Sequence, residues 1–220
     1  MRRALPLMAL GAVAASTSVQ ANDNWYVAVD YLKTDLKAND LNRLKTASEL
    51  EGGLDFNSGN GIGIAVGKQL QYTNNFVFAW EVEYIHYGTF TSSGDGRSNG
   101  VYYKDTWEVE AQSFNLNVKP KYYFYDSGLY VGAIAGIGVT SADLNVRVEV
   151  PNYNESVSLS DDGSDFSFNY GVEAGYEFTS GVVVSGGYRA SSVAIDVEGG
   201  GEFDFDFDSF FVGVEYQFGS

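Results

Sequence analysis

The 220-residue chain has no cysteine and only one histidine, His86. Without thiols it forms neither disulfides nor thiolate metal sites, and one imidazole excludes a multi-histidine metal centre. We therefore expect no cofactor. Basic residues are also scarce, with 13 Lys and Arg against 29 Asp and Glu, for a net charge of −16. Nucleic acids need a basic surface, so they are excluded as partners.

Long apolar runs are missing as well. A helix needs about 20 apolar residues to span a bilayer, and the run Ala4–Ala15 is shorter. It follows Arg2 and Arg3 and precedes Val19-Gln20-Ala21, which is the pattern of a secretory signal with a cleavage site. We predict a signal peptide over residues 1–21 and a mature domain over residues 22–220. If that domain spans a membrane, it must do so as a β-barrel.

Glycine and aromatic residues are abundant, with 26 Gly, 16 Tyr and 15 Phe. Many short segments rich in both are typical of all-β proteins. In the last segment, Phe210–Phe218, alternate residues from Val212 to Phe218 are apolar or aromatic, whereas the opposite parity becomes small and polar. Because side chains alternate along a strand, this segment predicts one apolar face and one polar face.

Seven further segments have the composition of strands. Alternation is clearest in Ser113–Phe124, although Pro120 cannot donate to a sheet ladder and could mark a bulge that shifts the phase. The eight predicted strands are Trp25–Tyr31, Gly61–Leu70, Phe78–Tyr87, Ser113–Phe124, Leu129–Val139, Phe166–Phe178, Val182–Arg189 and Phe210–Phe218.

The connections between these segments sort by length. Three short turns centre near residues 73, 127 and 180, and four long polar segments alternate with them. The long segments are residues 33–60, 87–106 (with a Gly- and Ser-rich loop at Gly88–Gly100), 140–165 and 190–209. Weak helical spacing in Asn39–Glu51 fits a short helix or an irregular loop. Short turns at one end and long loops at the other are typical of outer-membrane barrels. We predict an all-β fold, an eight-stranded antiparallel transmembrane β-barrel with short periplasmic turns and four long extracellular loops.

With this pattern, the mature chain resembles the small outer-membrane β-barrel family, the OmpA/OmpX-like and opacity-type group of porin-family proteins. The most specific likeness is the C-terminal run Gly213, Tyr216 and Phe218, which is similar to the family's assembly signal. Two features depart from that signal: Gly219 and Ser220 follow the aromatic residue, and Phe211 occupies a position that is usually polar. The resemblance implies a Gram-negative outer-membrane location. It also implies contact with outer-membrane lipid and lipopolysaccharide, and with the barrel-assembly machinery during biogenesis.

The polar faces of the predicted strands place seven charged residues inside the barrel. An eight-stranded barrel is only wide enough for its own side chains, so buried charges there must pair. We predict an interior ion network; a solvated core and a narrow polar pore are the alternatives. Its members are Glu81, Glu83, Lys119, Lys121, Glu173, Arg189 and Glu215.

The apolar faces of the predicted strands place large aromatic residues on the outside of the barrel. Such residues form girdles at membrane interfaces, although β-propensity alone also favours aromatics in strands. The predicted girdle residues are Trp25, Trp80, Tyr84, Tyr122, Tyr176 and Phe218.

The four long segments hold 19 acidic and seven basic residues. In Val197–Ser209, Phe203, Phe205 and Phe207 alternate with aspartates, so this part should stand above the membrane as a loop or strand extension. The acids fit a solvated surface, or a divalent-cation site that bridges to lipopolysaccharide phosphates.

The functional hypotheses follow from these features. Outer-membrane lipid A deacylases resemble barrels of this size, but His86 lacks their His and Ser spacing, and we predict no enzyme activity. We expect a structural, surface-interacting or adhesin-like protein whose acidic loops contact a host or surface ligand. A narrow porin-like channel is the alternative. A soluble lipocalin-like binder would need an apolar calyx, which the polar parity from Ser113 to Lys121 contradicts.

Overall fold

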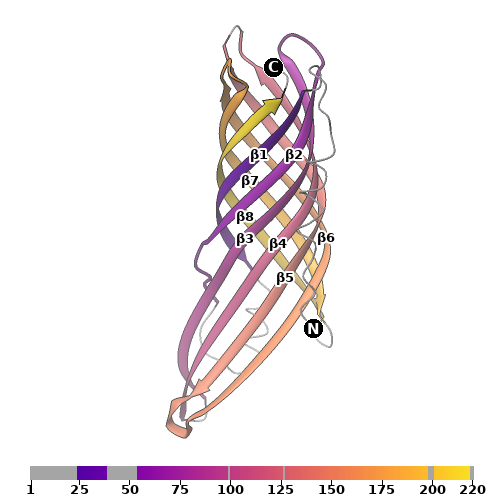
Figure 1. Cartoon of the computed structure of the whole chain (residues 1–220). Helices are drawn as coiled ribbons and strands as arrows, with labels where there is room; N and C mark the ends of the chain where they lie inside the picture. Colours follow the sequence, from indigo (N-terminus) through magenta and orange to yellow (C-terminus); the bar gives the residue numbers. More distant parts are fainter. Residues whose placement is uncertain (1–23, 39–53, 99, 126, 198–200, 219–220) are drawn as a thin grey trace.

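In the computed structural model, which describes residues 24–38, 54–98, 100–125, 127–197 and 201–218, eight antiparallel strands form one closed barrel (Figure 1). The strands are β1 (Trp25–Lys37), β2 (Gly59–Gln71), β3 (Phe76–Ser98), β4 (Val101–Tyr123), β5 (Leu129–Val150), β6 (Glu155–Glu177), β7 (Val182–Val197) and β8 (Gly201–Phe218). A single 3₁₀ turn, Pro151–Tyr153, joins β5 to β6. The described residues include no helix with the length and hydrophobicity to cross a membrane.

Each strand pairs with its neighbour in sequence, and β1 pairs with β8 from Trp25–Phe218 to Lys37–Asp206. This last pairing closes the sheet and leaves no edge along the body of the barrel. The predicted eight-stranded antiparallel barrel is therefore confirmed. The three short connections lie at one end, which is uppermost in Figure 1, together with the start of β1 and the end of β8.

At the opposite end the predicted loops are largely wrong. Strand pairing in β3–β4 continues to Ser98 and Val101, in β5–β6 to Val150 and Glu155, and in β7–β8 to Val197 and Gly201. Gly88–Gly100, 140–165 and 190–209 are therefore mostly strand rather than loop. For Val197–Ser209, where a loop and a strand extension were the alternatives, β8 begins at Gly201 and shows the strand extension. Pairing with a neighbouring strand supplies the backbone hydrogen bonds, and it overrides the low β-propensity of Gly, Ser and Asp. The predicted helix or loop at Asn39–Glu51 lies outside the described residues.

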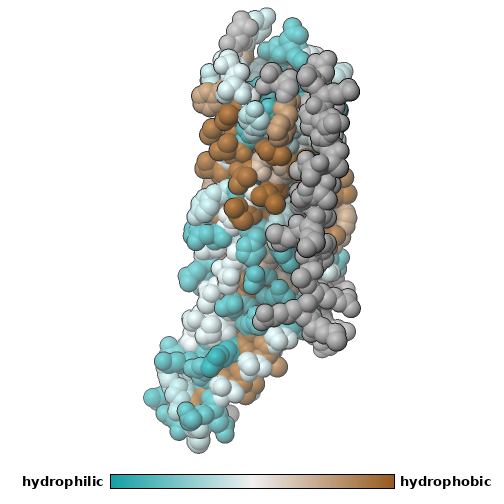
Figure 2. Space-filling model, in the orientation of Figure 1, coloured by the Kyte–Doolittle hydropathy of each residue, from teal (hydrophilic) through white to brown (hydrophobic). Residues whose placement is uncertain are grey.

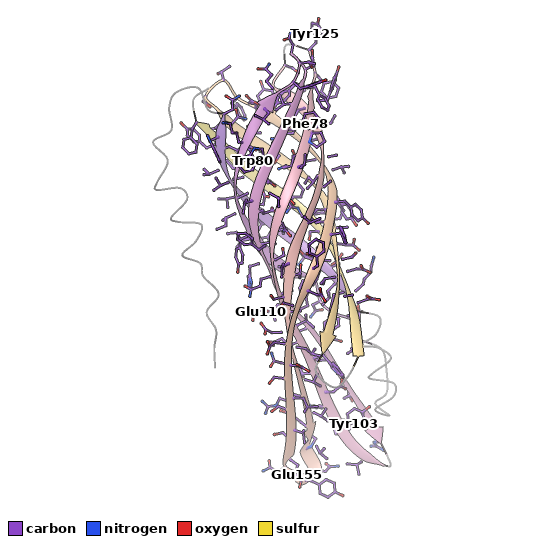
Figure 3. The ribbon with its side chains drawn as sticks, turned by 90° about the vertical axis from the view of Figure 1, so that its right-hand side faces the viewer. Phe78, Trp80, Tyr103, Glu110, Tyr125 and Glu155 are labelled. Carbon is purple, nitrogen blue, oxygen red and sulfur yellow. The ribbon has the colours of Figure 1, made fainter. Side chains whose placement is uncertain are left out.

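The four central strands are the longest, so the barrel wall is uneven. We call the part of these strands beyond the barrel body the projecting sheet; it comprises residues 89–98 of β3, 101–111 of β4, 142–150 of β5 and 155–166 of β6. Figure 1 shows these strands reaching farther from the short turns than β7 and β8. In Figure 3, Glu155 and Tyr103 lie at this far end and Tyr125 at the other.

A β-bulge between His86 and Gly88 changes the phase of β3. Gly88 has a φ of +92°, a conformation that glycine adopts without steric cost. Odd-numbered residues up to Ile85 face inward, whereas beyond the bulge the buried residues are the even-numbered Phe90 and Ser92. The phase shift that a bulge at Pro120 could have caused does not occur, because the β4–β5 register is the same on both sides of this residue.

Exposed apolar side chains on all eight strands form an apolar belt around the half of the barrel nearest the short turns. Figure 2 shows the belt on one face of the molecule. On β4 it runs from Phe114 through Leu116 and Val118 to Tyr122, and Phe124 continues it just beyond the strand end; all five side chains are exposed. Ten residues on a strand tilted by about 40° span a height of about 25 Å, which is the height of the lipid-facing band of outer-membrane barrels. The belt therefore has the size of a membrane-spanning surface.

Candidate functional site

The barrel interior beneath the apolar belt is filled by charged side chains. The structure brings all seven residues of the predicted network together there, and all are buried. An eighth, Asp30 of β1, joins them. Asp30 shares the inward parity of Tyr26 and Ala28, so its sequence position could have identified it.

Two lysines connect three carboxylates in this network. The Nζ atom of Lys119 lies 3.0 Å from Oε2 of Glu173 and 3.6 Å from Oε2 of Glu81. The Nζ atom of Lys121 lies 3.1 Å from Oε2 of Glu215 and 4.0 Å from Oε1 of Glu173. Glu173 is thus shared between adjacent lysines, so removing either lysine would disturb the partner of the other.

Arg189 forms a second centre. Its Nη1 lies 2.5 Å from Oε1 of Glu83, its Nη2 lies 3.5 Å from Oδ2 of Asp30, and its guanidinium stacks 4.8 Å from the centre of the Phe211 ring. The amide of Asn117 donates to both Glu81 and Glu83, at 3.0 and 2.8 Å, and so links this centre to the lysines. The charged groups form one continuous network across the barrel.

Tyr26 and Tyr130 pack around the network on the side of the short turns. The Tyr26 hydroxyl donates to Oε2 of Glu81 at 2.8 Å, and the Nζ atom of Lys121 lies 5.6 Å from the Tyr26 ring centre and 4.9 Å from that of Tyr130. A Cβ atom at Gly67 would overlap the Tyr26 ring. Glycine on β2 therefore makes room for the large side chain of β1.

Beyond the ion network, towards the projecting sheet, the interior becomes apolar. Phe207 stacks on Tyr87 with ring centres 4.7 Å apart, and Phe90 lies 5.9 Å from Phe207. We call this group the apolar cluster; its buried members are Leu32, Leu36, Ala38, Ile85, Tyr87, Phe90, Trp107, Val109, Ala111, Ile134, Ala142, Val193, Phe205, Phe207 and Phe211. The two clusters fill successive lengths of the same interior.

The sequence interpretation missed the apolar cluster. It treated Phe205 and Phe207 as part of a segment above the membrane, although they share the parity of the inward residues Phe211 and Glu215. Following that parity back along the chain would have placed both rings inside. The third phenylalanine of the pattern, Phe203, has a side chain outside the described part.

The six predicted girdle residues are divided unevenly along the apolar belt. Five lie towards the short turns, where Trp25 contacts Trp80 edge-on with ring centres 5.3 Å apart. In Figure 3, Trp80 and Phe78 lie in the same half of the molecule as Tyr125 and the turns. Tyr84 lies farther along β3, beside Phe114, and its hydroxyl donates to Gln112 at 2.8 Å. Other outward aromatic residues occupy that far side of the belt, namely Tyr31, Phe114, Phe166, Phe168 and Phe210.

Outside the belt, β1 and β8 are joined by an exposed ion pair. Lys37 Nζ lies 2.7 Å from Oδ2 of Asp208, and the Tyr188 hydroxyl donates to Oδ1 of the same carboxylate. These two hydrogen bonds lower the pKa of Asp208, and the bond to Asp208 raises the pKa of Lys37. Lys37 therefore forms an exposed ion pair that can be compared with the buried ion pairs of Lys119 and Lys121.

The outer face of the projecting sheet carries an acidic row. Glu110, Asp143 and Asp162 are opposite one another on β4, β5 and β6. Partial burial is the main cause that raises the pKa of Asp143, and repulsion from the carboxylates of Asp162 and Glu110 raises it further. In the part of the chain that the structure describes, no group of three or more acidic or histidine side chains is arranged to hold a metal ion.

The inner face of the projecting sheet is mainly apolar. Val146, Val148 and Val150 of β5 share the inward parity of Ala142, and their partners on β6 include Val157 and Leu159. Towards β6 the face becomes exposed, with Val157 at 63% and Leu159 at 69% accessibility. Val146 packs against the apolar cluster, so the strip continues that cluster out to the exposed side chains of β6.

His86 is on β3 beside the bulge, opposite Ile62 of β2 and Gln112 of β4. It is half-buried on the outward parity. The inward parity on either side of it carries Ile85 and Tyr87, which belong to the apolar cluster. His86 therefore contributes to the outer wall rather than to the filled interior.

The family model of the outer membrane protein beta-barrel domain matches residues 5–218. A search of curated protein sequences finds no match. Among solved structures, the chain is similar to the outer membrane protease OmpT from Escherichia coli, with 11% identity, a TM-score of 0.52 and coverage of 93% of this chain and 99% of that one.

Two further solved structures are also similar. Neisserial surface protein A has 15% identity and a TM-score of 0.49, with coverage of 88% of this chain and 97% of that chain. Ail, the attachment invasion locus protein of Yersinia pestis, was solved with the heparin analogue sucrose octasulfate; it has 11% identity, a TM-score of 0.44, and coverage of 89% and 99%. At such identities the likeness concerns the fold alone.

Proposed function

The chain belongs to the outer membrane protein β-barrel family and lies in the outer membrane of a Gram-negative cell, and from that premise we propose that it is a closed, non-enzymatic surface protein whose projecting sheet contacts material outside the cell. Family barrels have short periplasmic turns and longer external connections. The projecting sheet then stands on the external side of the apolar belt.

The observation that carries this proposal is the projecting sheet itself. Four adjacent strands continue beyond the belt as one hydrogen-bonded surface instead of ending in irregular loops. Binding residues held on a rigid strand scaffold are positioned more accurately than residues on loops. Such a sheet favours recognition outside the cell over a role confined to the membrane.

The charge of the projecting sheet favours a cationic partner. Its two hairpins, residues 89–111 and 142–165, contain ten acidic and three basic residues. One of the three cations, Arg147, is engaged by Glu149 at 2.8 Å. A field of one sign attracts ligands of the opposite sign and repels sulfated or phosphorylated ones.

The filled interior argues against the channel alternative. The ion network and the apolar cluster occupy successive lengths of the barrel, and residues such as Lys121, Glu81 and Phe207 are almost wholly inaccessible. An eight-stranded barrel leaves little space beyond that taken by its side chains. The proposal also includes contact with lipopolysaccharide through the apolar belt rather than the acidic sheet, and contact with the assembly machinery through Gly213, Tyr216 and Phe218.

We expect residues 22–220, refolded into a planar bilayer and shown to be folded by migration on an unboiled gel, to give no steady ion conductance. The physical reason is that ions cannot pass a filled, charge-paired interior without breaking its salt bridges. A steady conductance whose selectivity changes in Glu81→Gln or Lys119→Met would contradict the closed barrel and support the channel.

The surface role predicts that shortening the projecting sheet abolishes attachment. Cells displaying the full chain should be retained on a surface coated with lysozyme, a basic protein, and not on one coated with heparin. A variant in which residues 93–106 and 146–159 are each replaced by an Asn-Gly turn should lose at least tenfold in retention, because strand pairing is cut at matching positions. Equal retention of both forms at equal surface levels would refute the role.

A further inference from the structure

A hollow of about 290 Å³ opens on the outer face of the projecting sheet. This volume is near the lower end of the range of about 300–1,000 Å³ that is usual for small-molecule sites. Its side chains form two adjacent rows across β4, β5 and β6, because cross-strand neighbours on one face are about 5 Å apart. The rows are Glu108, Asn145, Ser160 and Thr106, Arg147, Ser158, and Val146 and Leu159 complete the lining. The hollow therefore offers hydroxyl, amide and carboxylate groups to one small ligand.

The two charged groups of the hollow differ in what they can still bind. Arg147 is engaged by Glu149, with Nε 2.8 Å from Oε1. Glu108 forms no ion pair within the described ranges, and its neighbours across the strands are the uncharged Thr91 and Asn145. The hollow therefore has a carboxylate available to a cation, whereas its guanidinium already has an anionic partner.

The acidic row borders the hollow on the side of the barrel body. Glu110 follows Glu108 on the same face of β4, about 7 Å farther along the strand. In Figure 3, Glu110 lies between the labelled belt residues and the far end of the sheet. Partial burial, together with repulsion from Asp162 and Glu110, raises the pKa of Asp143. A positive charge beside this row would be stabilised by it.

We propose that the hollow binds a hydroxylated amine, namely an amino sugar with a free ammonium group. The ammonium group lies against Glu108 on the side of the acidic row, and the sugar hydroxyls exchange hydrogen bonds with Asn145 and Ser160. This proposal rests on the surface role proposed above and names a small ligand for the outer face of the projecting sheet.

The chemistry of the hollow favours this class over other small ligands. A sulfated or phosphorylated sugar would bring negative charge next to Glu108 and the acidic row. A neutral sugar would leave that negative charge without a counterpart. A polyamine without hydroxyl groups would gain nothing from the amide of Asn145 or from the hydroxyls of Ser158 and Ser160.

The direct test is a labelled chitosan tetramer, whose amino groups are free, titrated against the folded protein in detergent micelles. The titration is made at about pH 5.5, where exposed carboxylates are ionised. We expect saturable binding to one site. The fully acetylated tetramer lacks the charge, and spermine has as many amino groups but lacks the hydroxyls, so each should bind at least tenfold more weakly. Equal binding by either control would overturn the proposal.

The role of the carboxylate is tested by two variants that remove the same charge. Glu108→Gln should weaken binding of the chitosan tetramer at least tenfold. Glu155→Gln, at the far end of the same sheet, should change it less than threefold. Equal weakening by both variants would mean that only the net charge of the sheet attracts the sugar, and the hollow would not be its site.

The position of the ligand is tested by filling the hollow. Ser158 and Ser156 are exposed and share the outer face of β6, but only Ser158 lines the hollow. Ser158→Ile should lose at least tenfold in binding of the chitosan tetramer, whereas Ser156→Ile should lose less than threefold. Folding of both variants is checked by migration on unboiled gels. Unchanged binding by folded Ser158→Ile would place the sugar elsewhere and refute the proposal.

These measurements separate the sugar site from the surface role. If the chitosan tetramer does not bind while the full chain, unlike the shortened one, still retains cells on lysozyme, the sugar proposal fails and the surface role stands. If the tetramer does not bind and both forms are retained equally, both proposals fail.

Discussion

Replacing Arg189 with methionine is expected to lower the free energy of unfolding by about 3–5 kcal/mol, because it leaves buried carboxylates without their cation. Glu83 and Asp30 both lie within ion-pair distance of the guanidinium, and all three side chains are buried. The measurement is urea unfolding of the protein in lipid vesicles, followed by tryptophan fluorescence and by migration on unboiled gels.

Two controls separate the buried pair from charge removal in general. Lys37→Met breaks the exposed pair with Asp208 and should leave stability unchanged within error, since exposed pairs contribute little. The triple variant Arg189→Met, Glu83→Gln, Asp30→Asn removes both signs of charge and should recover most of the loss. If Arg189→Met unfolds like the parent protein, the interior is hydrated and the proposed closed barrel loses its support.

Replacing Phe207 with alanine is expected to cost about 3–5 kcal/mol, because it leaves a cavity in the apolar cluster. The ring is 1% exposed and contacts both Tyr87 and Phe90. Phe207→Leu retains much of the volume and should cost less than half as much. Both variants are compared by the same urea unfolding in vesicles.

The neighbouring residue supplies the control for this substitution. Asp206 lies next to Phe207 on the opposite parity, where it accepts a hydrogen bond from exposed Ser192 at 2.6 Å. Asp206→Ala should change stability by no more than about 0.5 kcal/mol, as is usual for surface positions. Similar losses in Phe207→Ala and Asp206→Ala would mean that the apolar cluster does not stabilise the barrel.

Side-chain alternation predicted the membrane-spanning part of this fold well. In Ser113–Lys121 the polar parity faces a filled interior and the apolar parity faces lipid, so the two environments impose opposite compositions on alternate residues. The same logic assigned Lys119 and Lys121 to the interior. It missed Asp30, because this is a single charged residue on a strand face whose other members near it are apolar.

The projecting hairpins could not be predicted in this way. In Gly88–Gly100, Phe90 is the one large apolar residue and the rest are mostly Gly, Ser and Thr, so the segment shows no clear alternation and has the composition of a loop. The bulge at Gly88 also inverts the phase, so an alternation carried on from Glu81 and Glu83 would have placed Phe90 on the wrong face. How far two strands stay paired beyond the belt depends on the whole sheet, so the local sequence does not predict it.

The seam between β1 and β8 has a consequence for how the chain folds. Trp25 pairs with Phe218, so the first and last residues of the sheet must meet. Loop-closure entropy grows with the length of chain between partners, and folds dominated by distant pairings form slowly. Every other strand pair joins neighbours in sequence, so the nearly complete sheet must keep two open sides until its final strand is available.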